Sequence, residues 1–253
     1  MHDESWLKIY RDYRMDLHDF NRSPYEITAT QIKKACHDFL ETSQKEVRIL
    51  CKQDNREKRP QIFKDNGLFL LPIKNGKYVI VKGEGYVDIP EINSTEEEYK
   101  SKLNFKLDTS LVGDSEMQHL DFAYASSLIR TFMGDDSLVL TIRGRKYTPS
   151  FSFKVGKHVV DVSSVQTEVD AGYEGENQVV LVEAKNSGID NVIIRQLYYP
   201  FKQWQNHTKK SVITLFFEKR GNIYLIWRFK FNNVDDYNSI ELTKANKYII
   251  NDK

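Results

Sequence analysis

Residues 166–185, with the sequence QTEVDAGYEGENQVVLVEAK, contain the pattern that decides the fold of this chain. Side chains alternate between the two faces of a strand, so Glu168 and Asp170 share one face. Glu183 and Lys185 likewise share a face at the end of the apolar run QVVLVEAK. If the two strands pair through the turn region GYEGEN, their polar faces meet at one end of a sheet. The pattern therefore predicts a cluster of carboxylates beside one ammonium group.

Such a cluster is costly without a partner, because neighbouring carboxylates repel one another and burial adds a desolvation cost. A divalent cation relieves both effects, and ligands that are all oxygen favour a hard ion such as Mg²⁺ or Mn²⁺. A lysine beside the cluster suits the positioning or activation of an attacking water.

The alternative interpretation is a salt-bridged strand end without a metal. An acid-x-Lys triplet is weak by itself, because a second one, Glu98-Tyr-Lys100, stands in a plain polar stretch. The Glu183 triplet differs because it ends an apolar strand, where charged groups need a reason. This difference favours the metal site.

The surrounding sequence predicts a mixed sheet. A helix is expected over 114–132 and another over 190–206, where Pro200 must bend or interrupt the helix. Residues 211–218 and 222–231 form a strand pair through a Gly221 turn. Further strands are expected at 137–143, 147–155, 157–170 and 178–185. The fold class is α/β (α+β), with a mixed central β-sheet flanked by helices.

The N-terminal part is expected to form a smaller α+β domain, because the polar stretch 94–102 places a domain boundary near residue 105. Thr28 and Gln31 have capping-box spacing ahead of a helix over 30–43. Asn75-Gly76 marks the turn of a hairpin in GLFLLPIKNGKYVIV. The order of helix and hairpin fits a winged-helix-like, DNA-contacting unit.

A basic stretch lies between this helix and this hairpin. It is either a solvated face or a phosphate-contacting surface, and the sequence leaves both open. Its members are Arg48, Lys52, Arg56, Lys58 and Arg59.

Composition excludes several classes of protein. Of 253 residues, 37 are Lys or Arg and 36 are Asp or Glu, so net charge neither favours nor excludes a DNA partner. Cys36 and Cys51 have no zinc-ligand spacing, the histidines show no HExxH or HNH pattern, and no P-loop is present. Neither a signal peptide nor a membrane helix is visible, so we expect a cytoplasmic protein with no membrane partner.

The Asp170…Glu183-x-Lys185 pattern across two strands resembles the PD-(D/E)xK nuclease superfamily, with Val169 at the proline position of the motif name. The context EVDAGYEGENQVVLVEAKNSGIDNVIIRQLYYPFKQW also resembles a group of type II restriction endonucleases. The resemblance covers residues 137–231 and, more loosely, the N-terminal region. It implies a nuclease domain over 106–253, in which Asp170 and Glu183 coordinate Mg²⁺, with Mn²⁺ able to substitute. It also implies that Lys185 orients or deprotonates the nucleophilic water.

The same resemblance points to accessory residues. Glu168 is a candidate additional acid, and Glu116 lies where many of these folds place another acid. Gln196, followed by Tyr199, is similar to the QxxxY-type element of RecB-like exonucleases at shorter spacing. Gln196 would hold a metal-bound water or a phosphate; the alternative is an ordinary helix-surface amide.

Candidate DNA contacts lie at two places. Arg143, Arg145 and Lys146 are expected in a basic tight turn that contacts DNA, with an exposed hairpin tip as the alternative. Arg195 lies on the helix that follows the Glu-x-Lys strand.

The leading hypothesis is a Mg²⁺-dependent type II restriction endonuclease that cuts double-stranded DNA at a specific sequence. A homodimer is expected because two symmetric sites cut two strands of a palindrome, and a cognate DNA methyltransferase is the expected genetic partner. The alternatives are a repair or junction-resolving nuclease and a catalytically inactive DNA-binding module.

Overall fold

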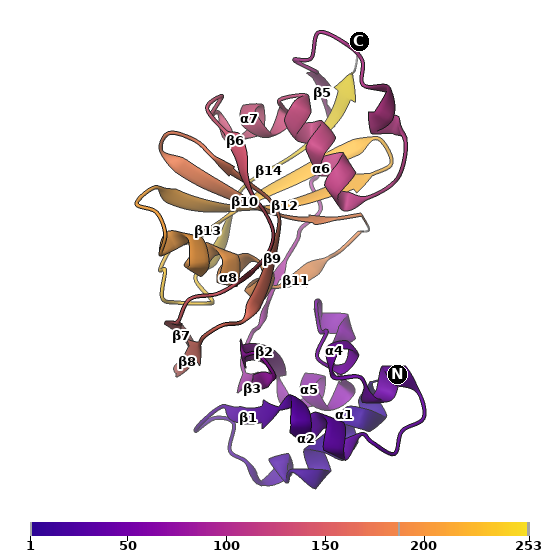
Figure 1. Cartoon of the computed structure of the whole chain (residues 1–253), viewed down its shortest axis with the longest axis vertical. Coiled ribbons are helices and arrows are strands. Elements are labelled where there is room, and N and C mark those ends of the chain that lie inside the picture. Colours follow the sequence, from indigo (N-terminus) through magenta and orange to yellow (C-terminus); the bar gives the residue numbers. More distant parts are fainter. Residues whose placement is uncertain (1, 187, 252–253) are drawn as a thin grey trace.

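A seven-stranded mixed sheet lies at the centre of the C-terminal part of the molecule (Figure 1). The computed structural model describes residues 2–186 and 188–251. In spatial order the strands are β5 (Glu97–Lys100), β14 (Ile240–Asn251), β13 (Ile223–Phe231), β12 (Ser211–Arg220), β10 (Gln178–Lys185), β9 (Gln166–Glu174) and β6 (Val139–Tyr147). The pairs β10–β12 and β14–β5 are parallel, and the other neighbours are antiparallel.

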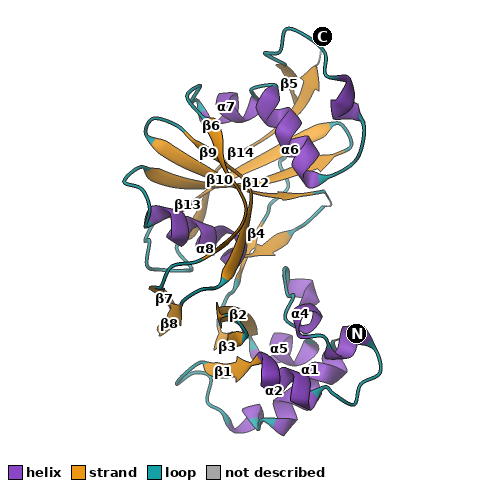
Figure 2. Ribbon diagram, viewed as in Figure 1, coloured by secondary structure: helices purple, strands orange, loops and turns teal. Residues whose placement is uncertain are grey.

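Helices cover both faces of this sheet (Figure 2). One face carries α6 (Glu116–Ala125) and α7 (Leu128–Met133), and the other carries α8 (Ile194–Gln205). The apolar run of β10 is buried on both sides, because Val180 and Val182 pack toward α6 whereas Leu181 packs with Trp204 of α8. A continuous apolar strand requires such two-sided cover. The predicted mixed sheet with flanking helices is confirmed.

The N-terminal part consists of short helices around a small sheet. The helices are α1 (Asp3–Asp12), α2 (Ala29–Ala35), α3 (Thr42–Lys45), α4 (Val47–Leu50) and α5 (Gln61–Asn66), with 3-10 turns η1 (Met15–Leu17) and η2 (Arg56–Lys58). The strands β1 (Tyr25–Thr28), β2 (Leu68–Lys74) and β3 (Lys77–Lys82) pair in the order β1-β3-β2. Two predicted details are confirmed: the Thr28–Gln31 capping box and the turn at Asn75-Gly76, where Gly76 has a φ of 73°.

The β2–β3 hairpin is buried on both of its faces. Leu68 and Leu70 belong to the core of the N-terminal part, together with Trp6 of α1. Phe69 and Leu71 point the other way, into the core under α8, where Phe69 stacks on Tyr237 with ring centroids 6.0 Å apart. The alternation of a strand therefore gives one hairpin a place in two cores.

Two further short strands connect the parts. β4 (Tyr86–Asp88) pairs with β11 (Asn191–Ile193), directly ahead of α8. β5 (Glu97–Lys100) pairs with β14 at the edge of the large sheet. The hairpin β7 (Phe151–Val155) and β8 (His158–Val162) packs against the aromatic side chains of α8. In the described part of the chain, no helix combines the length and apolar character needed to cross a membrane.

Several expected helices have different limits. The helix expected over 30–43 ends at Ala35, and the one over 114–132 is broken at Ser127, which has a φ of 69°. The helix expected over 190–206 begins only at Ile194, because the preceding residues pair with β4. Pro200 lies inside α8 without ending it.

The expected strand limits also change. Residues 157–170 form two strands rather than one, separated near Ser164, which has a φ of 54°. The predicted tight turn containing Arg143, Arg145 and Lys146 is wrong, because these residues lie within β6. The irregularity there is a bulge in the β6–β9 pairing beside Gly144, which has a φ of 83°. β14 was not predicted, because its polar sequence ELTKANKY shows no buried face.

The buried side chain of Asn191 joins the two parts through hydrogen bonds. Its Oδ1 accepts from Arg56 N at 2.7 Å and its Nδ2 donates to the Glu57 carboxylate at 3.1 Å, with 3% of Asn191 exposed. We expect Asn191→Ala to lower the free energy of unfolding by about 1–3 kcal/mol, because the partly buried Arg56 N–H loses its acceptor and the two parts lose a hydrogen-bonded link. Urea unfolding checks this. Asn222→Ala, in the exposed β12–β13 turn, is the control expected to change stability by less than about 0.5 kcal/mol; equal losses in both variants would contradict the assignment.

Candidate active site

The strands β9 and β10 part at the position of Asp170. Their last backbone pair is Val182 with Ala171. One step further, the Asp170 side chain takes over, because its Oδ2 accepts the N–H of Ala184 at 2.7 Å. β9 continues along β6, and β10 continues along β12. A polar cleft opens where the two strands diverge.

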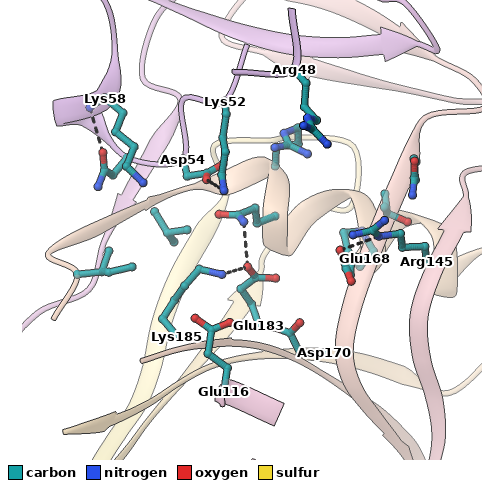
Figure 3. Close-up of a pocket in the computed structure, with 18 residues that line it drawn as sticks. Arg48, Lys52, Asp54, Lys58, Glu116, Arg145, Glu168, Asp170, Glu183 and Lys185 are labelled. Carbon is teal, nitrogen blue, oxygen red and sulfur yellow. Dashed lines mark hydrogen bonds and ion pairs between the residues drawn. The ribbon is translucent and has the colours of Figure 1, made fainter. Parts of the chain in front are cut away.

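The predicted polar faces meet in this cleft, whose volume is about 690 Å³ (Figure 3). Glu183 is 8% exposed, and its Oε1 contacts Lys185 Nζ. The same Oε1 accepts a hydrogen bond from Gln196 Nε2 at 2.9 Å. Glu116, at the first turn of α6, accepts from Asn186 N at 3.2 Å. Residues from β9, β10, α6 and α8 therefore converge on one cluster.

Burial destabilises the carboxylates of this cluster. It raises the pKa of Glu183 to about 7, with the charge of Asp170 adding to the shift and Lys185 opposing it. Burial also raises the pKa of Asp170, against the Ala184 N–H and the Lys185 charge. For Lys185, burial alone would lower the pKa, but attraction to Glu183 and Asp170 outweighs it and the pKa is raised. A second cation would stabilise both acids.

The donor set fits a hard divalent ion that keeps most of its water. Within residues 2–186 and 188–251, no three His, Cys, Asp or Glu side chains come together closely enough to hold a metal unaided. Mg²⁺ commonly takes only one or two protein carboxylates, with waters and substrate phosphates completing the shell. Asp170 and Glu183 provide two carboxylates. Gln196 Oε1 is buried without a hydrogen-bond partner in the described chain, so it offers a further acceptor for such a water.

The candidate DNA-contacting residues divide into two groups. Arg145 and Arg195 line the cleft, and Arg145 Nε lies 3.1 Å from the Glu168 carboxylate. Arg143 instead pairs with Asp121 of α6, and Lys146 Nζ lies 6.0 Å from the centre of the Trp204 ring. Neither Arg143 nor Lys146 is among the residues that line the cleft.

The opposite wall of the cleft comes from the N-terminal part, which the site prediction did not include. The basic stretch was visible in the sequence, but the direction of each side chain was not. Arg56 is engaged by Asp88, and Arg59 lies over the Tyr86 ring. The lining residues absent from the predicted site are Arg48, Lys52, Asp54, Asn55, Lys58, Gln166, Thr167, Ile189, Val192 and Pro200.

The site belongs to an α+β protein with buried carboxylates at a divergence of two strands. The chain is a member of the family described as "Domain of unknown function (DUF6997)", which matches residues 81–249. Residues 3–80 match a second family, described as "Domain of unknown function (DUF6996)". The two matches meet between residues 80 and 81, whereas the polar stretch 94–102 predicts a division near residue 105. No curated protein and no solved structure matches the chain.

Mg²⁺ is expected to stabilise the wild-type protein against unfolding, because binding to the folded state alone shifts the equilibrium. At ten times the dissociation constant the gain is about 1.4 kcal/mol. Asp170→Asn keeps an acceptor for the Ala184 N–H but removes the charge, so we expect this gain to disappear. Thermal unfolding with Mg²⁺ and with EDTA measures it. Glu176→Gln, in the exposed β9–β10 turn, should retain the full stabilisation by Mg²⁺. If this variant also lost the stabilisation, the effect would come from the overall negative charge of the protein and not from the site.

Glu183 makes the stability of the metal-free protein depend on pH. In the folded state the Glu183 carboxyl group stays protonated up to about pH 7, whereas the ordinary pKa of this group is 4.5. The free energy of unfolding therefore falls as the pH rises through this interval, by up to about 3 kcal/mol. Glu183→Gln removes this carboxyl group. The free energy of unfolding of the variant, relative to that of the wild type, should therefore increase as the pH rises. Urea unfolding in EDTA at about pH 5 and 8 measures this, and parallel pH curves for the two proteins would refute it.

Proposed function

We propose that this protein is a Mg²⁺-dependent endodeoxyribonuclease of the PD-(D/E)xK superfamily with a restriction-endonuclease-like fold. The observation that carries the proposal is the convergence of Asp170, Glu183 and Lys185 at the divergence of two strands, inside a cleft that basic side chains also line. Carboxylates and cations in one cleft match a substrate that is a phosphodiester and a chemistry that needs a divalent ion.

Each residue of the cluster has a part in phosphodiester hydrolysis. Asp170 and Glu183 would hold Mg²⁺, which when bound stabilises negative charge on the scissile phosphate and acidifies water. Lys185, whose ammonium group contacts Glu183, would orient the attacking water. Gln196 fixes the Glu183 carboxylate through its amide hydrogen bond. Arg145 and Arg195, which line the cleft, would neutralise phosphates that flank the cleaved one.

Within this class we favour a site-specific type II restriction endonuclease that acts in the cytoplasm as a homodimer on double-stranded DNA. Two copies related by a two-fold axis present two sites to two strands. In the N-terminal part β1 lies between α1 and α2, the β2–β3 hairpin follows α5, and the strands pair in the order β1-β3-β2, which supports a winged-helix-like interpretation. The alternative within the class is a repair or junction-resolving nuclease. A gene for a cognate DNA methyltransferase beside this one would favour restriction.

Plasmid digestion with Mg²⁺ or Mn²⁺ tests the proposal. We expect wild-type protein to give discrete bands, and Asp170→Ala and Lys185→Ala to lower the rate by on the order of a hundredfold or more, because each removes charge at the reacting phosphate. The matched control is the double variant Glu98→Ala/Lys100→Ala, which removes the second acid-x-Lys triplet on the edge strand β5 and should cut normally.

The other outcomes are also informative. A smear that still requires Asp170 and Lys185 would keep the nuclease site and favour the repair or junction-resolving alternative. Intact DNA with either metal, for both duplex and single-stranded substrates, would refute nuclease activity and leave an inactive DNA-binding module.

A further inference from the structure

The wall of the cleft that faces the carboxylates is built by residues 48–58 of the N-terminal part. Figure 3 places Arg48, Lys52 and Lys58 on one side of the cleft and Asp170 and Glu183 on the other. The same three basic residues also border a second hollow of about 470 Å³, together with His2 and Ile49. The basic surface therefore continues past the cleft onto the outside of the N-terminal part.

These three side chains make little use of their charges within the protein. All three residues are exposed, and Lys52 Nζ lies 3.7 Å from Asp54, with 68% of the lysine side chain accessible. Among the described residues this is their only ion pair. The neighbouring Arg56 and Arg59 are instead held by Asp88 and by the Tyr86 ring. Arg48 and Lys58 have no ion pair in the described part of the chain, and Lys52 has only the 3.7 Å pair with Asp54. The like charges therefore repel each other, and an anion from outside would stabilise them.

Residues 48–58 are hydrogen-bonded to the segment directly before α8, the helix that contributes Arg195 and Gln196 to the cleft. Ile193 N donates to Asp54 O at 2.8 Å, and Asn191 Oδ1 accepts from Arg56 N at 2.7 Å. Ile193 and Asn191 directly precede α8, which carries Arg195 and Gln196. The three basic residues therefore hold a defined position relative to the carboxylate cluster.

We propose that Arg48, Lys52 and Lys58 form a clamp for the phosphate backbone of duplex DNA, opposite the carboxylates that would cut it. This inference rests on the proposed nuclease function and adds the surface that provides sequence-independent affinity. A single small anion would engage only part of a surface that borders two hollows, whereas a polyanion meets all of it. Phosphate contacts position a duplex without reading its bases.

The salt dependence of binding tests the clamp. We would measure the fluorescence anisotropy of a labelled duplex of about 20 bp in EDTA, at about 50–300 mM KCl. The variant is Lys52→Ala/Lys58→Ala. Each lost phosphate contact reduces the slope of log affinity against log salt by about 0.9 in magnitude, so we expect a reduction of about 2. At about 100 mM KCl, affinity should fall roughly 10- to 100-fold.

The matched control is Lys33→Ala/Lys34→Ala, which removes two exposed charges from α2 in the same part of the chain, outside both hollows. It should retain the wild-type slope. Urea midpoints verify that both variants fold, and Arg48→Gln provides an independent single-charge variant, expected to reduce the slope by about 0.9.

The outcomes separate the clamp from the nuclease proposal. A slope change confined to the clamp variants supports the clamp. Wild-type slopes in both clamp variants overturn the clamp but leave the nuclease site in place, since plasmid cutting depends on Asp170 and Lys185. Tighter binding of a single strand of equal length overturns the assignment to duplex. No binding of DNA by wild-type protein, together with no cutting, removes both proposals.

Discussion

The hydrogen bond from Ala184 N to Asp170 Oδ2 is the interaction on which the site depends. A backbone N–H at the end of a buried strand needs an acceptor, and here a side chain provides it where the neighbouring strand has turned away. Without the Asp170 side chain as acceptor, β9 and β10 would have to continue pairing and close the cleft, or the buried Ala184 N–H would lack an acceptor. The carboxylate that joins the cluster is therefore also the group that allows the cluster to exist.

Local alternation made the centre of this arrangement predictable. The apolar run of β10 and the charged residues at its end are determined by neighbours in sequence, as is the Asn75-Gly76 turn. The contact between α8 and Glu183 was harder to predict from the sequence, because it depends on where the strand formed by residues 191–193 pairs. Alternation also fails to predict side-chain direction where a strand bulges. Arg143 and Arg145 are two residues apart, so regular alternation would put them on the same face of β6. At the bulge beside Gly144, however, Arg143 contacts Asp121 and Arg145 contacts Glu168. The N-terminal wall depends on contacts more than a hundred residues apart, which no local pattern encodes.

A net charge of +1 conceals a strong separation of charge. Apart from Asp54, the acids that line the cleft come from the large sheet and α6, and most of its cations come from residues 48–58 and α8. Opposite charges that face each other across a polar cleft are suited to a ligand that carries both phosphates and a metal ion. The overall balance of the composition is thus compatible with the proposed partner, because local distribution rather than total charge determines attraction.

The hairpin shared by two cores limits how the cleft can work. Moving the N-terminal part away from the sheet would pull Phe69 and Leu71 out of the aromatic layer beside Tyr237, exposing apolar surface to water. The two walls are thus not free to swing apart like jaws. Under the proposed function, a duplex would therefore have to enter between two walls that are already in place, without an opening motion that exposes this core.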